Sequence, residues 1–367
     1  MSEFQPSVPA SGEKRRASEN TEPKDSTSTR TANEPAFHHH VVLTDKSGTF
    51  NVWVQGNLED VHKEDGTKCV FLTCHDIGNN HHSFRKLFSN PNFQEIRQHA
   101  VFVHVDLPGQ EDGAEDLADD SPFPKIQALG EDLVTVLDLL QIKCCIGIGD
   151  GAGANIIIRF AIMHVKRCLG VILLHPTANA STMIESFKDR FSKWKVEHSA
   201  ENIVAFRKFG HKLEDTEDQE KAFEDYKEKL KHKVNAKNMT KFTHVFHKRT
   251  DIVPNLKDGL KCDALLVVGT RSSSLHAAEY MHSHMNKSRT SMLKVDGVGD
   301  VMEESPGKLA YSILLFCKGL GWLSSLSLPG TNRQSLRRGQ SFQRQRSLSM
   351  EEYDKPNIRR LASSPRE

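Results

Sequence analysis

The stretch Ile146-Gly147-Ile148-Gly149-Asp150-Gly151-Ala152-Gly153-Ala154-Asn155 decides the fold of this chain. An apolar run before it, Lys143–Ile146, is typical of a buried strand, and Ala154–Phe160 begins a helical pattern. Between them, Gly149–Gly153 has the G-x-Nu-x-G pattern of a nucleophile elbow, the sharp turn on which hydrolases present their attacking side chain. The central residue is Gly151, which has no side chain. The sequence therefore predicts an elbow that has kept its turn and lost its nucleophile.

Strands and helices alternate on both sides of this elbow. Val41–Leu43 and Phe50–Val54 flank the turn Asp45–Gly48, which is a hairpin signal. Apolar residues recur at helical spacing over residues 126–140. Further apolar runs predict buried strands: Cys69–Cys74, Val101–Val105, Cys144–Gly149, Gly170–Leu174, Ala264–Val268 and Ser291–Val295. This order predicts an α/β protein with a mostly parallel central sheet and helices on both faces.

The chain is expected to contain one large domain, residues 37–328, between two tails. Residues 1–36 and 329–367 are polar, the second rich in Arg and Ser, and both are predicted to be disordered. Residues 180–253 are helical in pattern and highly charged, without a convincing strand. They predict a helical cap inserted above the carboxyl ends of the strands. Three aromatic residues at helical spacing predict a buried stripe of this cap or, alternatively, a partner contact: Phe187, Phe191 and Trp194.

Composition excludes several classes of function. The 367 residues carry a formal net charge of +1, which gives no general attraction to nucleic acid. Residues Met1–Glu34 lack the apolar segment of a signal peptide. The apolar run Leu309–Leu320 is too short to span a membrane and is expected to be the last buried helix. We therefore expect a cytoplasmic protein.

The other positions of a catalytic triad have also been replaced. A hydrolase places its acid in a Gly-x-x-Asp pattern after the strand that ends at Gly269, and here that position holds Ser272. Its base follows the last strand, where this chain has Asp300 in place of histidine. Gly151, Ser272 and Asp300 therefore mark a vestigial triad, and no catalytic residue is predicted.

An oxyanion segment survives in part. His75 and Asp76 follow the third predicted strand, where hydrolases donate a backbone N–H, and the N–H of Ala152 is the second donor. The carboxylates of Asp76, Asp150 and Asp300 oppose a developing oxyanion and favour a cation or an amide. The alternative is that these carboxylates are solvated or accept hydrogen bonds from N–H groups of turns.

Three stretches resemble signatures of the N-myc downstream-regulated family: Phe71–His81, Val105–Ala114 and Gly147–Asn155. The resemblance covers roughly residues 38–328, with the motifs in family order and spacing. It implies an α/β-hydrolase fold without hydrolytic activity. Family members are cytoplasmic proteins of signalling, stress response, growth control and differentiation. This chain departs from many of them at Asp150, where alanine is common, and in the helical insertion.

Neither a cofactor nor a metal is predicted. The glycines of residues 147–152 fit a loose dinucleotide fingerprint, but no acidic residue ends the next strand at Leu174. The runs His38–His40 and His81–His82 lack the carboxylate or cysteine companions of a zinc site, and contiguous histidines of a strand cannot all face one ion. Ser272–Ser274 offers a displaced nucleophile, without a histidine placed to activate it other than His276.

The tails carry motifs for basophilic Ser/Thr kinases. Residues 344–349 fit R-x-R-x-x-S, which kinases of the Akt and serum-glucocorticoid type recognise, and residues 15–18 fit R-R-x-S, the preference of cyclic-AMP-dependent kinase. The candidate phosphorylation sites are Ser349, Ser18, Ser347, Ser341 and Ser363. Each phosphate adds about −1.5 to −2 charges beside the arginines. The alternative for the basic tail is weak contact with anionic lipid, which phosphorylation weakens.

These observations predict a non-catalytic signalling protein that acts as an adaptor or scaffold under the control of phosphorylation. Its partners are expected to be proteins, including the kinases that act on the tails, and not nucleic acid. One alternative is an enzyme that uses displaced residues such as Asp76, Asp150 or His75. Another is a small-molecule sensor that uses the vestigial pocket.

Overall fold

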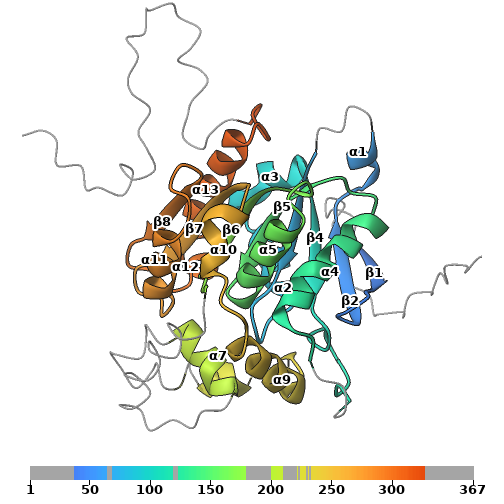
Figure 1. Ribbon diagram of the computed structural model, residues 1–367, viewed down its shortest axis with the longest axis vertical. Helices are drawn as coiled ribbons and strands as arrows, with labels where there is room; N and C mark the ends of the chain where they lie inside the picture. Colours follow the sequence, from blue (N-terminus) through green and yellow to red (C-terminus); the bar gives the residue numbers. More distant parts are fainter. Residues whose placement is uncertain are drawn as a thin grey trace, which may run out of the picture. The chain divides into compact units, whose positions relative to one another are not determined.

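The computed structural model describes residues 37–63, 68–118, 123–178, 200–209, 221, 224–228, 230 and 233–326, all within the unit that starts at Pro35. Its elements (Figure 1) are β1 (Phe37–Leu43), β2 (Thr49–Gln55), α1 (Glu59–His62), β3 (Cys69–Cys74), α2 (His81–Ser89), η1 (Pro91–Phe93), α3 (Gln94–Gln98), β4 (Ala100–Asp106), α4 (Ile126–Leu139), β5 (Cys145–Asp150), α5 (Ala152–Met163), β6 (Cys168–Leu174), α7 (Ala200–Phe209), α9 (Ala236–His247), α10 (Val253–Gly259), β7 (Asp263–Gly269), α11 (Leu275–Ser283), β8 (Thr290–Val295), α12 (Val301–Glu304) and α13 (Pro306–Gly319). The predicted phosphorylation sites and the aromatic residues Phe187, Phe191 and Trp194 lie outside the described residues.

The strands of the described residues form one sheet in the order β1-β2-β4-β3-β5-β6-β7-β8. β1 and β2 form the expected antiparallel hairpin, and β2 is also antiparallel to β4. All other neighbouring strands are parallel. The predicted α/β class with a mostly parallel sheet is therefore confirmed.

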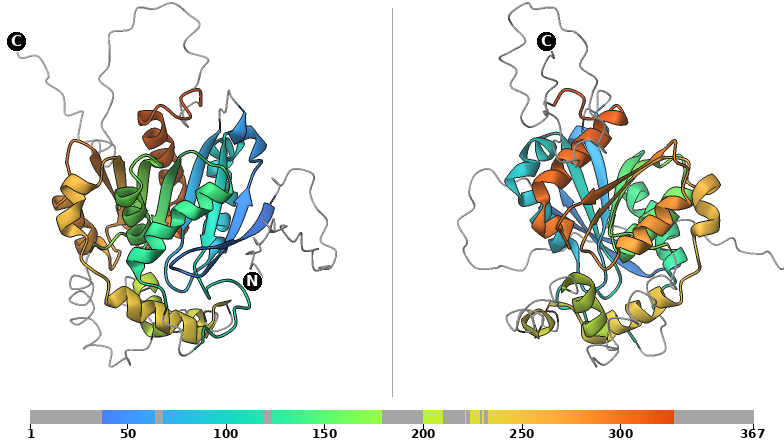
Figure 2. Two further views of the ribbon diagram at one scale, coloured as in Figure 1. Left: turned by 45° about the vertical axis from the view of Figure 1, so that its right-hand side comes forward. Right: turned by 90° about the vertical axis from the view of Figure 1, so that its left-hand side faces the viewer.

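Side chains of the central strands alternate between two separate hydrophobic layers, because successive residues of a strand point to opposite faces. In β3, Val70 and Leu72 belong to the layer that α4 and α5 cover. Cys69 and Phe71 belong to the layer that α2, α3 and α13 cover. Figure 2 shows these helices on both faces of the sheet.

Helix α13 is buried along one side, as the run Leu309–Leu320 predicts. Leu309, Ile313 and Cys317 have no exposed side-chain surface, because they pack on the sheet. Among the described residues, no helix has the length and apolar character needed to cross a bilayer.

Two described helices of the insertion, α7 and α9, lie between β6 and β7 in the chain and beyond the carboxyl ends of the strands in space (Figure 1). They pack closely against the loop that follows β3. At Gly78 in this loop, φ is +76°, and a Cβ would lie 2.8 Å from Val204 and 3.0 Å from Leu230. The insertion therefore covers the sheet edge where β3 and β5 end. This is the switch point of the strand order, where open parallel sheets place their sites.

Candidate functional site

The elbow joins β5 to α5 in a tight turn. Gly151 has φ +53° and ψ −108°, a conformation that L side chains rarely adopt. Gly149 and Gly153 serve a different purpose, which is close packing. A Cβ on Gly153 would lie 2.0 Å from the carbonyl oxygen of Cys74, and one on Gly149 would lie 2.4 Å from Cα of Ala154. The segment therefore has the shape of a nucleophile elbow, and its central residue offers nothing that can attack a bond.

The backbone donor next to the elbow is occupied by a side chain of the protein itself. In hydrolases with this turn, the N–H of the residue after the nucleophile binds the substrate oxyanion. Here the N–H of Ala152 donates to Oδ1 of Asp76 over 2.8 Å. Asp76 is in reach because it follows β3, which is the neighbour of β5 in the sheet. Its carboxylate thus takes a place where a substrate oxygen would bind, as the alternative of a turn-satisfying carboxylate predicts.

The residues at the acid and base positions have structural roles of their own. Ser272, after β7, accepts a hydrogen bond at Oγ from the N–H of Ser274 over 3.2 Å. Asp300, after β8, caps α12 by accepting from the N–H of Met302 over 2.9 Å. Burial opposes the charge on Asp300, but His175 and Lys208 outweigh it and lower the pKa of the carboxyl. Asp300 is therefore an anion that caps the start of α12.

His175, at the end of β6, faces the elbow and pairs with Asp150. Its Nδ1 lies 2.8 Å from Oδ1 of Asp150, and its Nε2 accepts the N–H of Val301 over 3.2 Å. Burial opposes a charge on the ring, but the carboxylates of Asp150, Asp300 and Asp76 outweigh it and raise the pKa of His175. A protonated ring has no lone pair on Nε2, so it cannot accept the longer hydrogen bond from Val301. The neutral ring keeps its hydrogen bonds with both Asp150 and Val301. In neither state does a ring nitrogen remain free to take a proton from a substrate.

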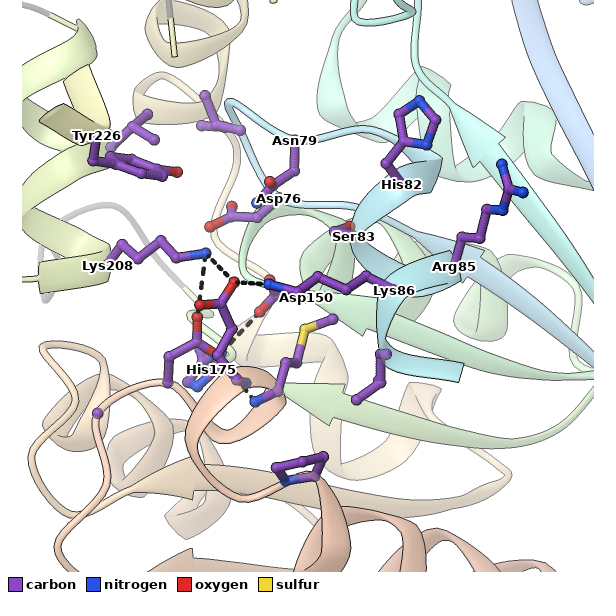
Figure 3. Close-up of a pocket in the computed structure, with 18 of the residues that line it drawn as sticks. Asp76, Asn79, His82, Ser83, Arg85, Lys86, Asp150, His175, Lys208 and Tyr226 are labelled. Carbon is purple, nitrogen blue, oxygen red and sulfur yellow. Dashed lines mark hydrogen bonds and ion pairs between the residues drawn. The ribbon is translucent and has the colours of Figure 1, made fainter. Parts of the chain in front are cut away.

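A cavity of about 840 Å³ opens above the elbow (Figure 3). Its lining includes the carboxylates of Asp76, Asp150 and Asp300, which come from loops and strand ends at the carboxyl edge of the sheet. Lys208 and Tyr226 line it from the insertion. The negative carboxylates and the positive amine of Lys208 therefore face the same cavity.

Ion pairs tie the insertion to the sheet across this cavity. Nζ of Lys208 lies 3.0 Å from Oε1 of Glu303 and 3.6 Å from Oδ2 of Asp300. The same Glu303 oxygen lies 3.3 Å from Nζ of Lys86 on α2. Burial disfavours the charge on Lys208, but Tyr226, Asp300 and Glu303 outweigh it and raise the pKa of the amine. Burial also raises the pKa of Tyr226 to about 12. The cavity wall therefore carries a network of ion pairs, in which amines of the insertion and of α2 face carboxylates that follow β8.

His75 does not line the cavity. Its side chain is fully buried, with Nδ1 donating to the carbonyl of Asp76 over 2.8 Å and Nε2 accepting the N–H of Leu107 over 3.2 Å. Burial lowers the pKa of His75. The ring joins the loops after β3 and β4, which is a structural role.

Sequence reasoning missed His175, Lys208 and Tyr226. The signal for His175 was present, since it directly follows a predicted strand that ends at Leu174, as Asp150 directly follows the one that ends at Gly149. Lys208 and Tyr226 belong to the insertion, where no strand pattern fixes the direction of a side chain. They could not be assigned to the site from the sequence.

Comparison with known structures places the fold among hydrolases. An esterase from Thermogutta terrifontis is 16% identical with a TM-score of 0.55, over 77% of this chain and 99% of the esterase. A proline iminopeptidase-related protein from Thermus thermophilus is also 16% identical, with a TM-score of 0.57 over 78% of this chain and 98% of that protein. At these identities the likeness shows the α/β-hydrolase fold alone.

Comparison of sequences gives the family. The uncharacterized protein ZK1073.1 of Caenorhabditis elegans is 41% identical over 322 residues, which are 86% of this chain and 92% of that protein. Protein NDRG3 of Xenopus laevis is 30% identical over 293 residues, 77% of this chain and 75% of the relative. The sequence profile of the Ndr family matches residues 40–324. The resemblance seen in the sequence motifs is therefore confirmed, and the chain belongs to the Ndr family.

Proposed function

We propose that this protein is a catalytically inactive α/β-hydrolase-fold protein that acts in intracellular signal transduction as a phosphorylation-regulated adaptor or scaffold. The observation that carries the first half is the hydrogen bond from the Ala152 N–H to the Asp76 carboxylate beside a glycine elbow. An acyl-transfer enzyme keeps such a donor for the charge that develops in its transition state. A resident carboxylate occupies that donor and repels a second negative charge.

The cavity gives little support to the alternative of an enzyme that uses displaced catalytic residues. Asp150 is paired with His175, and that ring has partners on both nitrogens. Asp76 accepts the elbow N–H, and His75 is buried away from the cavity. Both imidazoles named here therefore have partners on their two nitrogens, and neither is placed as a free general base.

The purified protein is therefore expected to show no turnover of ester, amide or epoxide substrates above buffer. Gly151→Ser should stay inactive as well, because the His175 imidazole beside the elbow has hydrogen-bond partners on both nitrogens. Backbone polarisation alone gives about 10³-fold over water, and Asp76 removes most of that. The measurement is a substrate screen on the wild type, Gly151→Ser and Asp150→Ala. As a control, Asp263→Ala changes an exposed carboxylate at the start of β7, at the end of the strand opposite to the cavity. Turnover that disappears in Asp150→Ala but persists in Asp263→Ala would overturn the proposal.

The signalling half of the proposal is supported by family membership and by the kinase motifs of the tails. We place the protein in the cytoplasm, with protein partners and with basophilic kinases acting at Ser349. A phosphate there changes the tail charge by about −1.5 to −2 beside Arg344 and Arg346. Such a change alters which surfaces an arginine-rich segment can bind.

Ser349→Ala is expected to change the set of proteins that co-purify from cells, the cellular location, or both. Ser335→Ala is the matched control, because this serine lies in the same tail with Asn332, not arginine, three positions before it. Affinity purification with quantitative mass spectrometry measures the difference. An identical partner set and location for Ser349→Ala and the wild type contradicts control by the tail.

The cavity supports a second candidate function, that of a small-molecule sensor. Its volume of about 840 Å³ falls in the range of ligand pockets, roughly 300–1,000 Å³. Native mass spectrometry of protein purified from cells tests this function. A stoichiometric small molecule that is lost in Lys208→Ala supports the sensor, and a ligand-free wild type favours the adaptor.

A further inference from the structure

Two imidazoles and one carboxylate meet at the start of α2, and one of the three residues, His82, also lines the cavity. One ligand atom each from His81, His82 and Asp112 lies within 4.8 Å of the other two. The histidines are the first two residues of α2, and Asp112 lies in the turn after β4, 30 positions from His82. The histidine pair His81–His82 has no carboxylate beside it in the sequence, but the fold brings Asp112 close to it. In Figure 3 the ring of His82 points away from Asp150 and His175, so the cluster is separate from the elbow.

The ring of His81 is held in the orientation and tautomer of a metal ligand. Its Nδ1 donates to Oδ2 of Asp106 over 2.6 Å, and its backbone N–H donates to Oδ1 over 2.5 Å. Asp106 is fully buried and also accepts from Nε1 of Trp53. Because Nδ1 carries the hydrogen, Nε2 carries the lone pair. Histidines that bind metals commonly donate their other ring nitrogen to a carboxylate in this way.

Asp112 has a comparable supporting partner. Its Oδ1 accepts from Nδ2 of Asn80 over 2.6 Å, and its Oδ2 accepts from Nε2 of His82 over 2.5 Å. Oδ1 of Asn80 also accepts the backbone N–H of His82, so one amide fixes both the helix start and the carboxylate. An ion bound here would replace the proton that His82 and Asp112 share.

The donor set indicates the class of ion. Two imidazole nitrogens and one carboxylate oxygen suit Zn²⁺ and neighbouring divalent transition ions, whereas Ca²⁺ and Mg²⁺ prefer oxygen ligands throughout. Three protein ligands leave a position for water or another group. An ion can reach the cluster from solvent, because the side chains of His82 and Asp112 are 41% and 55% exposed while His81 is 3% exposed.

We propose that His81, His82 and Asp112 bind a divalent transition ion of the zinc class, with Asp106 and Asn80 as outer partners that orient the ligands. The bound ion joins the start of α2 to the turn after β4. This site is independent of the adaptor role proposed above, and it uses no residue of the vestigial triad.

The test is titration of the chelator-treated full-length protein with Zn²⁺, followed by isothermal calorimetry. The wild type is expected to bind one equivalent at this site. His82→Ala and Asp112→Asn should each weaken that binding by at least ~100-fold, since loss of an outer partner alone typically costs about 10- to 100-fold. Asp112→Asn retains the shape of the side chain, so the fold should survive, which circular dichroism checks.

Two variants serve as matched controls. His276→Ala removes a histidine whose side chain is 87% exposed and lies 3.7 Å from the carboxylate of Glu279, without a second imidazole. Asp116→Asn removes an aspartate of the same loop that pairs with Lys237. Both should bind Zn²⁺ as the wild type does. Absence of stoichiometric binding by the wild type, or equal binding by His82→Ala, would overturn the site.

Co²⁺ as a spectroscopic probe separates this site from the cysteines. A site of nitrogen and oxygen ligands gives visible bands without the intense near-ultraviolet band of a thiolate ligand. The expected spectrum lacks the thiolate band in the wild type and loses its visible bands in His82→Ala. A strong thiolate band at one equivalent of Co²⁺ would place the ion on cysteine and contradict the proposal.

Discussion

Gly153→Ala is expected to lower the free energy of unfolding by about 4 kcal/mol, a large part of the roughly 5–15 kcal/mol by which a typical domain is stable. The methyl group would lie 2.0 Å from the carbonyl oxygen of Cys74 and 2.6 Å from that of His75. Both neighbours are backbone atoms of the central sheet and its following loop, so neither can rotate away. Relief requires α5 to move off the sheet. Urea denaturation followed by circular dichroism measures the loss.

Gly319→Ala is the matched control for this prediction. This glycine ends α13, and a Cβ there would meet nothing within 4 Å. Alanine should leave the protein unchanged or stabilise it by up to about 0.5–1 kcal/mol. If Gly153→Ala cost less than about 1 kcal/mol, the close approach of α5 to β3 would be wrong.

Asp106→Ala is expected to cost about 4 kcal/mol, because it removes a fully buried carboxylate with three N–H donors. The donors are the backbone N–H and Nδ1 of His81, at 2.5 and 2.6 Å, and Nε1 of Trp53, at 3.2 Å. After truncation they remain in a site closed to water. The start of α2 and strand β2 both lose the hydrogen bonds that join them to Asp106. Thermal and urea unfolding measure the effect.

Asp106→Asn separates hydrogen bonding from volume. The amide has nearly the same shape and one acceptor oxygen, so it can keep part of the contact with His81. The loss in free energy of unfolding should be clearly smaller for Asp106→Asn than for Asp106→Ala. Equal losses for the two variants would mean that the carboxylate acts mainly by filling space, contrary to the hydrogen-bond argument.

The fold could be predicted from the sequence because its signals are local. The glycine pattern of residues 147–153 forces a tight strand–helix turn, and the apolar runs on both sides have the lengths of buried strands. The same register predicts the triad positions at Gly151, Ser272 and Asp300, since each lies in the turn or loop that follows a recognisable strand. The hairpin was placed correctly but too short, because β1 extends back to Phe37 through three histidines that do not resemble a strand core.

The contacts of the site could not be predicted, because they depend on which loops become neighbours. Asp76 reaches the N–H of Ala152 only because β3 lies next to β5. His175 reaches Asp150 because β6 lies on the other side of β5. Asp112 accepts a hydrogen bond from His82 across 30 residues of chain. None of these distances is encoded in a motif, and each follows from the strand order.

The bond between Asp76 and the elbow amide also bears on how the chain can evolve. Hydrolysis through the usual triad would need a hydroxyl or thiol at position 151, an imidazole at position 300, and removal of the Asp76 carboxylate from the amide of Ala152. A substitution at position 151 alone would leave that carboxylate on the amide, so a single change does not rebuild the site. Selection on such a first change would have to act on something other than hydrolysis by this triad.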